Sequence, residues 1–169
     1  MPQIALLELV AITVLQIVDA GLTTSILSWS EYHEIVSFTY QWRGVFENSE
    51  VNDLHRDAFE FRVDDPSVTD WELMLERHSL GWVTARDGAH LVGFVNVIWD
   101  GRTHAWIQDV MVNSASRNLG IGSRLVTTAC AATRSAGCEW LHVDFDARLA
   151  NFYFACGFEP TTAGLIRLR

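Results

Sequence analysis

The amino-acid sequence predicts an α/β protein with a mixed, mostly antiparallel central sheet flanked by helices and an apolar helical extension at the N-terminus. Residues 81–112 hold three β-type runs separated by Asp-Gly turns, which is typical of antiparallel strands. At residues 109–125 the hydrophobic period changes from extended to helical, with Gly120 and Gly122 at the change. Residues 1–30 are apolar almost all round a helix, which indicates the extension.

The chain has 169 residues, enough for one α/β domain and too few for two of ordinary size. We expect an apolar helical extension at 1–30 and a single domain at 31–169. The extension could dock on the domain or on a second copy in a homodimer, could be dispensable, or could contact a membrane. Insertion is disfavoured because the uncharged run between Glu8 and Asp19 is shorter than the roughly 20 apolar residues that span a bilayer.

The charge balance is acidic, with 12 basic against 21 acidic residues and a formal net charge of -9. A nucleic-acid partner is therefore not expected, because phosphate binding needs a basic surface. An acidic surface suits a cationic amine substrate and equally suits plain solubility. Cys130, Cys138 and Cys156 are odd in number and lack a C-x-x-C spacing, so we expect no disulfide framework, no metal site and a cytoplasmic location.

The first half of the chain predicts one strand and two helices. Residues 34–46 are rich in β-branched and aromatic residues, which favours a strand. Asn48 is expected to cap a helix that carries apolar residues at helical spacing. The Asp-Pro-Ser signal at 65–67, with Asp70 completing a capping box, predicts a second helix that stops at Gly81.

The second half predicts a strand meander followed by alternating helices and strands. Strands are expected at 81–86, 91–99 and 104–112, then a helix from the glycine turn to residue 137, a strand at 139–145, a helix at 148–156 and a last strand at 163–168. The expected order is therefore strand, two helices, three strands, helix, strand, helix, strand.

The glycine turn is suited to hold an anion. Gly120 and Gly122 let backbone N–H groups approach a ligand, and the start of the following helix adds unpaired donors. Arg117 can supply positive charge. A plain tight turn is the alternative. A dinucleotide fingerprint would need a third glycine where Leu125 stands, and a P-loop would need a lysine, which the chain lacks.

Two motifs resemble the GNAT family of N-acetyltransferases. One is Arg-Asn-Leu-Gly-Ile-Gly-Ser-Arg-Leu at 117–125, directly after a Val-Met-Val strand, which resembles the acyl-CoA-binding signature. The other is Ala-Asn-Phe-Tyr-Phe-Ala-Cys-Gly-Phe at 150–158, which resembles the C-terminal signature. The resemblance covers roughly residues 34–169 and implies a GNAT acetyltransferase domain with acetyl-CoA as co-substrate and no metal.

The resemblance also implies which residues bind the donor. In the family, the loop amides hold the diphosphate of CoA, and the preceding strand pairs with the pantetheine arm. The implied set is Val110, Met111, Val112, Arg117, Asn118, Leu119, Gly120, Ile121, Gly122, Ser123 and Asp146. The chain departs from the family at two points, since Asp146 stands where many members carry Asn, and Asn118-Leu119 replaces a basic residue.

Acyl transfer to an amine needs a base for the amine and an acid for the departing thiolate. By its match to the motif, Tyr153 is the candidate acid, with a core tyrosine as the alternative. Asp109 lies on the strand beside the expected thioester, and His142 and Asp144 share one face of the next strand, so each is a candidate base or a structural residue. His142 and Asp144 could also form a metal pair, although no third ligand is evident.

The sequence thus predicts an N-acetyltransferase that transfers acetyl from acetyl-CoA to a primary amine of a small molecule or peptide by direct attack in a ternary complex. Cys156 is interpreted as a small buried residue rather than an acyl-enzyme nucleophile. The alternatives are a non-catalytic acyl-CoA sensor or dimerisation module of the same fold, and an unrelated nucleotide-binding enzyme.

Overall fold

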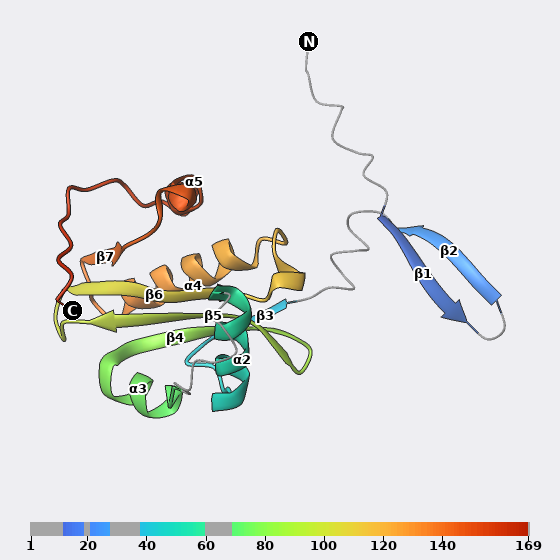
Figure 1. Cartoon of the computed structure of the whole chain (residues 1–169), viewed down its shortest axis with the longest axis horizontal. Helices are drawn as coiled ribbons and strands as arrows, with labels where there is room; N and C mark the ends of the chain where they lie inside the picture. Colours follow the sequence, from blue (N-terminus) through green and yellow to red (C-terminus); the bar gives the residue numbers. More distant parts are fainter. Residues whose placement is uncertain (1–11, 19–20, 28–37, 60–68, 169) are drawn as a thin grey trace, which may run out of the picture. The chain divides into compact units, whose positions relative to one another are not determined.

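The structure is a computed structural model that describes residues 12–18, 21–27, 38–59 and 69–168 (Figure 1). The chain divides into two compact units, residues 1–38 and 39–169. We describe each unit by itself. The domain boundary expected near residue 30 falls outside the described residues and stays a prediction.

The N-terminal unit contains a β-hairpin where the sequence predicts a helix. Strand β1 (Ile12–Val18) pairs antiparallel with β2 (Gly21–Leu27) in a regular register from Ile12 and Leu27 to Val18 and Gly21. The helical prediction is therefore wrong for these two segments. Both are rich in Ile, Val and Thr, whose branched side chains lose rotamer freedom in a helix and fit a pleated strand.

The second unit is built on a mixed sheet with the strand order β3-β4-β5-β6-β7. The strands are β3 (Phe38–Trp42), β4 (Ser79–Asp87), β5 (His90–Trp99), β6 (His104–Val112) and β7 (Trp140–Val143). Strands β4, β5 and β6 form the predicted antiparallel meander, and β7 runs parallel to β6. The predicted fold class, a mostly antiparallel sheet flanked by helices, is confirmed.

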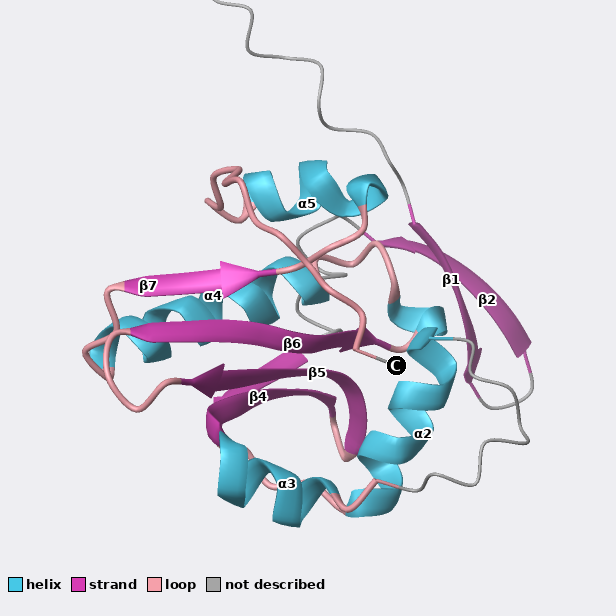
Figure 2. Ribbon diagram, turned by 60° about the vertical axis from the view of Figure 1, so that its left-hand side comes forward, coloured by secondary structure: helices cyan, strands magenta, loops and turns pink. Residues whose placement is uncertain are grey.

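Four α-helices and two short 3-10 turns complete the described part of this unit. They are α2 (Asn48–Phe59), α3 (Trp71–His78), η1 (Ser114–Ser116), α4 (Ile121–Ser135), η2 (Ala147–Leu149) and α5 (Ala150–Ala155). Helix α4 contacts β4, β5 and β6, whereas α2 contacts β5 and β6, and α3 contacts β4 and β5. Figure 2 shows the helices around the sheet.

Two successive residues of β5 show that the helices cover opposite faces of the sheet. A Cβ atom at Gly93 would lie 2.9 Å from Leu125 and 3.0 Å from Ile121, so this position faces α4 at a distance that favours glycine. Its neighbour Phe94 is fully buried in a cluster with residues of α2 and α3, including Trp71. Because side chains alternate along a strand, α4 lies on one face and α2 with α3 on the other.

Strand β6 contains a β-bulge near its C-terminal end. Asn96 pairs with Gln108 and Phe94 with Met111, so two residues of β6, at 109 and 110, oppose one of β5. Asp109 has a φ of +52°, a left-handed conformation that is uncommon for a residue with a side chain. The bulge therefore holds the backbone of Asp109 in a strained conformation near the C-terminal end of β6.

The junction between α2 and α3 corrects two predicted caps. Asn48 serves α3 rather than α2: its Oδ1 accepts from the backbone N–H of Glu72 at 3.1 Å. Asp70 is the N-cap of α3, and its carboxylate accepts from the N–H of Leu73 at 3.1 Å. Helix α3 thus begins at Trp71, and the signal at 65–67 lies outside the described residues.

The side chain of Asn52 makes four hydrogen bonds at the same junction. Its Nδ2 donates to the carbonyls of Asn48 at 2.8 Å and Thr69 at 2.9 Å. Its Oδ1 accepts from the N–H of Thr69 at 3.1 Å and from Nε1 of the buried Trp71 at 3.2 Å. One amide therefore fixes the start of α3 against α2, which the sequence did not predict.

Two further boundaries differ from the predictions. Gly81 does not stop α3, because the helix ends at His78 and Gly81 lies within β4. Residues 163–168 form no strand, and the apolar Leu165 and Leu168 are 97% and 88% exposed. A strand needs a hydrogen-bonding neighbour, and in this structure residues 163–168 pair with no other strand. Among the described residues, none of the helices has the length and hydropathy to span a bilayer.

We predict that Asn52→Ala lowers the free energy of unfolding by about 2–3 kcal/mol, because it leaves the buried indole N–H of Trp71 unpaired and removes further hydrogen bonds. The matched control is Asp53→Ala, the next residue of α2, whose carboxylate is in an exposed ion pair with Arg56. The control should change stability by less than about 0.5 kcal/mol. Urea unfolding followed by tryptophan fluorescence measures both, and equal effects of the two variants would contradict the role of Asn52.

Candidate functional site

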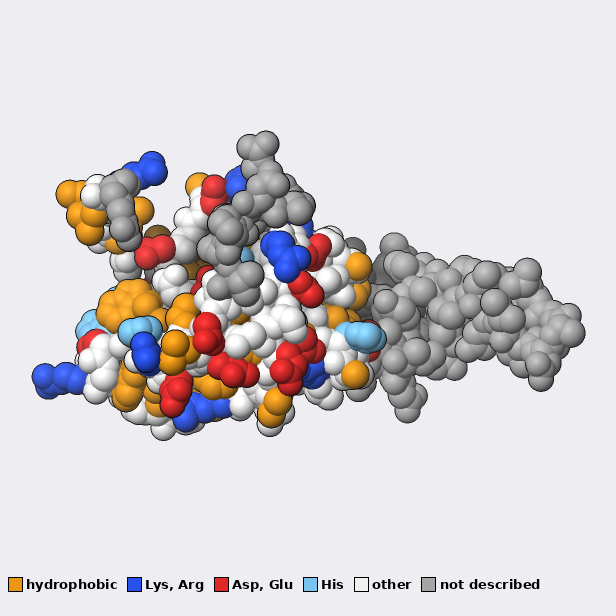
Figure 3. All heavy atoms as spheres, turned by 60° about the horizontal axis from the view of Figure 1, so that its bottom comes forward, with side chains coloured by type: hydrophobic (Ala, Val, Ile, Leu, Met, Phe, Trp, Pro, Cys, Tyr) orange, Lys and Arg blue, Asp and Glu red, His pale blue; other side chains and the backbone are white. Residues whose placement is uncertain are grey.

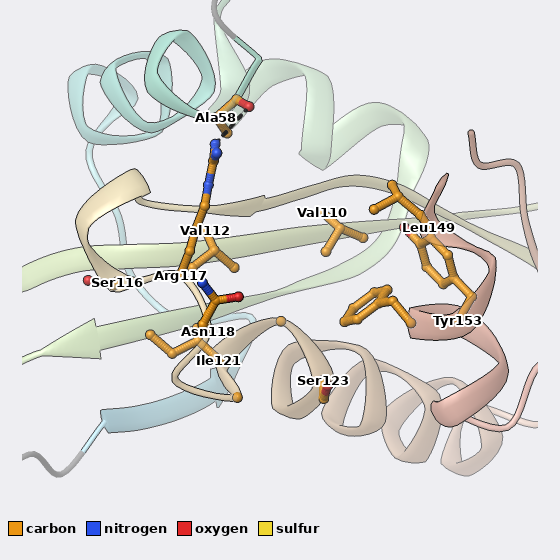
Figure 4. Close-up of a pocket in the computed structure, with 13 residues that line it drawn as sticks. Ala58, Val110, Val112, Ser116, Arg117, Asn118, Ile121, Ser123, Leu149 and Tyr153 are labelled. Atoms are coloured by element: carbon orange, nitrogen blue, oxygen red, sulfur yellow. Dashed lines mark hydrogen bonds between the residues drawn. The ribbon is translucent and has the colours of Figure 1, made fainter. Parts of the chain in front are cut away.

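A cavity of about 360 Å³ opens between β6, the start of α4 and α5. Pairing between β6 and β7 ends at Ile107 and Val143, and β6 continues beyond this point to Val112. The cavity lies along this continuation. It is lined by Ala58, Val110, Val112, Ser116, Arg117, Asn118, Gly120, Ile121, Gly122, Ser123, Leu149, Phe152 and Tyr153, most of which Figure 4 labels.

The start of α4 presents backbone donors to one end of the cavity. Gly120 is the N-cap, with a φ of +78°, and it offers no side-chain cap to the first turn. The N–H groups of residues 121–123 are the first of the helix, where the dipole is positive. A Cβ atom at Gly122 would meet the ring of Phe152 at 3.3 Å, so glycine keeps this turn close to α5. The geometry is that of an anion site.

The loop before α4 is held by the end of α2. The carboxylate of Asp57 accepts from the backbone N–H of Ser114 at 2.6 Å and from its hydroxyl at 2.8 Å. These hydrogen bonds lower the pKa of Asp57 below its ordinary value. A carboxyl group whose pKa is lowered by folding stabilises the folded state at pH values above its unfolded-state pKa. This stabilisation is lost as the pH falls through the lower, folded-state pKa. These two hydrogen bonds between Asp57 and Ser114, here called the clasp, are therefore fully formed at neutral pH.

Arg117 forms the second link between the loop and α2. Its Nη2 donates to the carbonyl of Ala58 at 3.2 Å, and Figure 4 shows the side chain crossing one end of the cavity. The guanidinium has five N–H donors, so this single bond leaves others for an anion. The sequence prediction that Arg117 brings positive charge to the loop agrees with its position in the cavity wall.

Tyr153 closes the other end of the cavity. It lies on α5, is 5% exposed and stacks on Phe145 with ring centroids 4.7 Å apart. Burial, with a smaller contribution from Cys156, raises the pKa of Tyr153 above its ordinary value of 10.0. The phenol is therefore protonated at neutral pH and can donate a hydrogen bond or a proton.

Asp109 lies at the bulge next to the cavity-lining Val110 and faces the other side of the sheet. Burial raises the pKa of Asp109, and the charge of His55 and a hydrogen bond with Asn96 partly oppose this rise. Asn96 is itself 3% exposed and accepts from the hydroxyl of Ser79 at 2.7 Å. Asp109 is thus a partly desolvated carboxylate on the face covered by α2 and α3, beside the point where β6 and β7 part.

His142 is engaged with other rings. Its Nε2 lies 2.8 Å from Nδ1 of His104, so one imidazole donates to the other, and its ring stacks on Trp106 with centroids 5.0 Å apart. Asp144 follows β7 and is exposed. Within the described residues, no group of three His, Cys, Asp or Glu side chains could hold a metal ion. The three cysteines are free and half-buried.

The comparison with protein families decides the family of the chain. The model of the acetyltransferase (GNAT) family matches residues 48–158, which include the loop, Asp109 and Tyr153. The chain belongs to the GNAT family. No curated protein matches its sequence significantly.

Solved structures share the GNAT fold at low sequence identity. A probable acetyltransferase from Staphylococcus aureus has a TM-score of 0.65 and 20% identity, over 79% of this chain and 99% of that one. A putative acetyltransferase from Deinococcus radiodurans has a TM-score of 0.60 and 25% identity, over 78% and 88%. AAC(6')-Iy, solved with the bisubstrate analog CoA-S-monomethyl-acetylneamine, has a TM-score of 0.64 and 16% identity, over 79% and 98%.

Eight of the eleven residues that the resemblance to GNAT proteins implies as contacts of the acetyl-CoA donor line the cavity. The three outside it are Met111, Leu119 and Asp146. Met111 is fully buried in the core beneath α2 and α3, because alternation turns it away from Val110 and Val112. Leu119 is exposed, and the carboxylate of Asp146 caps η2 and pairs with Arg148. These three residues therefore lie outside the cavity lining, and the donor contacts that the resemblance implies for them stay a prediction.

Sequence reasoning missed four cavity residues of the GNAT domain, Ala58, Ser116, Leu149 and Phe152. Phe152 could have been found, because it precedes Tyr153 in the C-terminal motif. Ala58 reaches the cavity from α2, and nothing in the local sequence indicates that contact. The same is true of Asp57, which lies 57 residues before its partner Ser114.

We predict that Asp57→Ala loosens the loop before α4, because the backbone N–H of Ser114 loses its acceptor. Amide hydrogen exchange at residues 114–120 should become about 3- to 10-fold faster, as expected for the loss of roughly 1 kcal/mol. Exchange in β4 and β5 should not change. Asp53→Ala, one turn earlier on α2, is the matched control and should leave the loop as it is. Unchanged exchange in the Asp57 variant would show that the loop does not depend on this clasp.

Proposed function

We propose that the protein transfers an acetyl group from acetyl-CoA to a primary amine by direct attack within a ternary complex. The observation that carries this proposal is the cavity, which joins the uncapped start of α4 to the buried hydroxyl of Tyr153 along the free continuation of β6. Membership in an acetyltransferase family supports it.

The donor would lie along the cavity with its diphosphate at the start of α4. There the N–H groups of residues 120–123 and the guanidinium of Arg117 are the available donors. The pantetheine arm would follow β6 from Val112 to Val110, because β7 no longer pairs with this part of the strand. An extended arm can then hydrogen-bond to the backbone in place of a neighbouring strand.

In this arrangement, the amine nitrogen attacks the thioester carbonyl carbon, and a backbone N–H near the bulge stabilises the oxyanion. The C–S bond then breaks, the departing thiolate takes the proton of the Tyr153 hydroxyl, and the phenolate regains a proton from the product nitrogen, directly or through water, which leaves the neutral amide. This role fits a phenol that burial keeps protonated at neutral pH. Its place in the cavity wall supports the assignment.

The base is proposed to be Asp109. An amine with a pKa of about 10.4 must be deprotonated at a cost of roughly 4 to 5 kcal/mol at pH 7, so a nearby proton acceptor accelerates attack. Asp109 is partly desolvated, which makes it a better base than an exposed carboxylate, and it lies beside Val110 at the bulge. His142 is the second candidate, although one of its nitrogens is already bonded to His104.

We predict that Tyr153→Phe lowers kcat for acetyl transfer by about 10²- to 10⁴-fold, the usual contribution of a general acid. The dissociation constant of acetyl-CoA should change by less than threefold, roughly 0.6 kcal/mol, because the ring and its stacking on Phe145 are kept. A thiol-release assay and calorimetry measure the two quantities. Phe154→Leu, an exposed position on the same helix, is the control for α5 stability. Full activity of the Tyr153 variant would remove the hydroxyl from the mechanism.

We further predict that Asp109→Asn lowers kcat by about 10²-fold or more and removes the acid limb of its pH profile. The direction of this pH dependence follows from the role of Asp109 as a base. A base must be ionised to accept a proton, so activity is lost as the pH falls through the raised pKa of Asp109. His142→Gln should keep this limb. Loss of the limb in the His142 variant and its retention in the Asp109 variant would instead assign the base to His142.

A further inference from the structure

One face of the last helical segment forms the cavity wall at the end where Tyr153 lies. Leu149, Phe152 and Tyr153 are spaced at i, i+3 and i+4 along η2 and α5, which puts their side chains on one face. All three line the cavity, and Figure 4 shows Leu149 beside Tyr153 at the end opposite Arg117. Leu149 and Tyr153 therefore bound the same space.

Neighbouring rings hold the phenol of this wall in place. The Tyr153 ring stacks on Phe145 with centroids 4.7 Å apart, and it meets Phe152 and Phe158 edge-on at 4.8 Å and 5.8 Å. Leu149 differs from the buried tyrosine because it is 47% exposed. A substitution can therefore shorten the wall at Leu149 without opening a hole in the hydrophobic core.

The cavity end opposite Arg117 is apolar apart from the phenol hydroxyl. Val110 lines it from the strand and Leu149 from the helical side. Among the described residues that line the cavity, Arg117 alone has a cationic side chain. Arg148 lies outside the lining, with its guanidinium in an exposed ion pair. A carboxylate brought to this end would lose hydration without gaining a partner, which weakens its binding.

The charge of the whole protein disfavours a carboxylate as well. The chain has a formal net charge of -9, and Figure 3 shows Asp and Glu side chains gathered across the middle of one face. A negative field lowers the local concentration of an anionic group. The diphosphate of CoA would meet Arg117 and the N–H groups at the start of α4, which offset this field. An acyl carboxylate at the other end of the cavity would meet no such groups.

We propose that Leu149 is a specificity-determining residue that restricts the donor to a short, uncharged acyl group such as acetyl. This inference rests on the proposed acyl transfer and specifies the donor class of the same site. Because Tyr153 protonates the departing sulfur in that mechanism, the thioester lies within hydrogen-bond reach of the phenol. The carbons beyond the carbonyl then lie between Val110 and Leu149. An acetyl methyl fits there, whereas a longer chain meets the leucine side chain.

The test compares acetyl-CoA with hexanoyl-CoA, whose acyl chain is four methylene groups longer, and uses one amine acceptor taken from a broad panel. Overpacking should give acetyl-CoA a kcat/KM about 5- to 150-fold higher in the wild type. Leu149→Ala should lower this ratio by about fivefold or more. Leu73→Ala, the same truncation at a 41% exposed position of α3, is the matched control and should keep the wild-type ratio. A wild-type ratio of one or less, or an unchanged ratio in the Leu149 variant, overturns the inference and leaves acetyl transfer standing.

Succinyl-CoA tests the apolar character of the same end. Shortening Leu149 makes room there but adds no cation. Leu149→Ala should therefore gain activity with hexanoyl-CoA, while its kcat/KM for succinyl-CoA rises by less than about twofold. Equal gains with the two donors would show that the substitution loosens the site for any acyl group, and would overturn the assignment of Leu149.

A binding measurement separates this inference from the proposed function. Calorimetry without an amine gives the dissociation constants of acetyl-CoA and hexanoyl-CoA for the full chain, as wild type and as Leu149→Ala. If no amine of the panel is acylated, the proposed function fails, and binding alone decides the inference. The inference then stands if the substitution tightens hexanoyl-CoA binding about fivefold or more relative to acetyl-CoA, and any smaller change overturns it.

Discussion

The parting of two parallel strands is the constraint on which the rest of the site depends. Backbone pairing holds β6 and β7 together from His104 and Trp140 to Ile107 and Val143, and it ends there. Beyond that point β6 keeps β5 as a partner on one side and faces the cavity on the other. The unpaired backbone of β6 needs hydrogen-bonding partners, which an extended ligand or water can supply.

The bulge at residues 109–110 shifts the alternation of side chains along β6 by one residue. Gln108 pairs with Asn96, and the side chain of Asp109 bonds to Asn96, so these two consecutive residues both lie on the side of α2 and α3. Val110 and Val112 line the cavity on the side of α4. A donor on one side of β6 and an acceptor on the other could therefore meet at the bulge, and the strain at Asp109 is localised where the proposed chemistry occurs.

Much of this organisation could be predicted because its signals are local. The Asp-Gly turns, the glycine turn before α4 and the Tyr-containing helix each lie within a few residues of chain. The clasp of Asp57 on Ser114, the bonds of Asn52 to Thr69 and Trp71, and the pairing of His104 with His142 could not, because each joins residues at least 17 positions apart and depends on the fold already formed. The pairing of β1 with β2 was not predicted, because apolar periodicity outweighed the β-branched content of these segments. A strand was wrongly predicted at 163–168, because β propensity alone supplies no pairing partner.

The central claim is that the start of α4 and the free edge of β6 together hold the CoA donor. A ¹H–¹⁵N NMR titration of the full chain with CoA tests it most directly, because it reports on each backbone amide. The account predicts that the amides of residues 110–112 and 120–123 shift together and saturate at the same CoA concentration. Saturable shifts confined to other parts of the chain, with these amides unmoved, would contradict it.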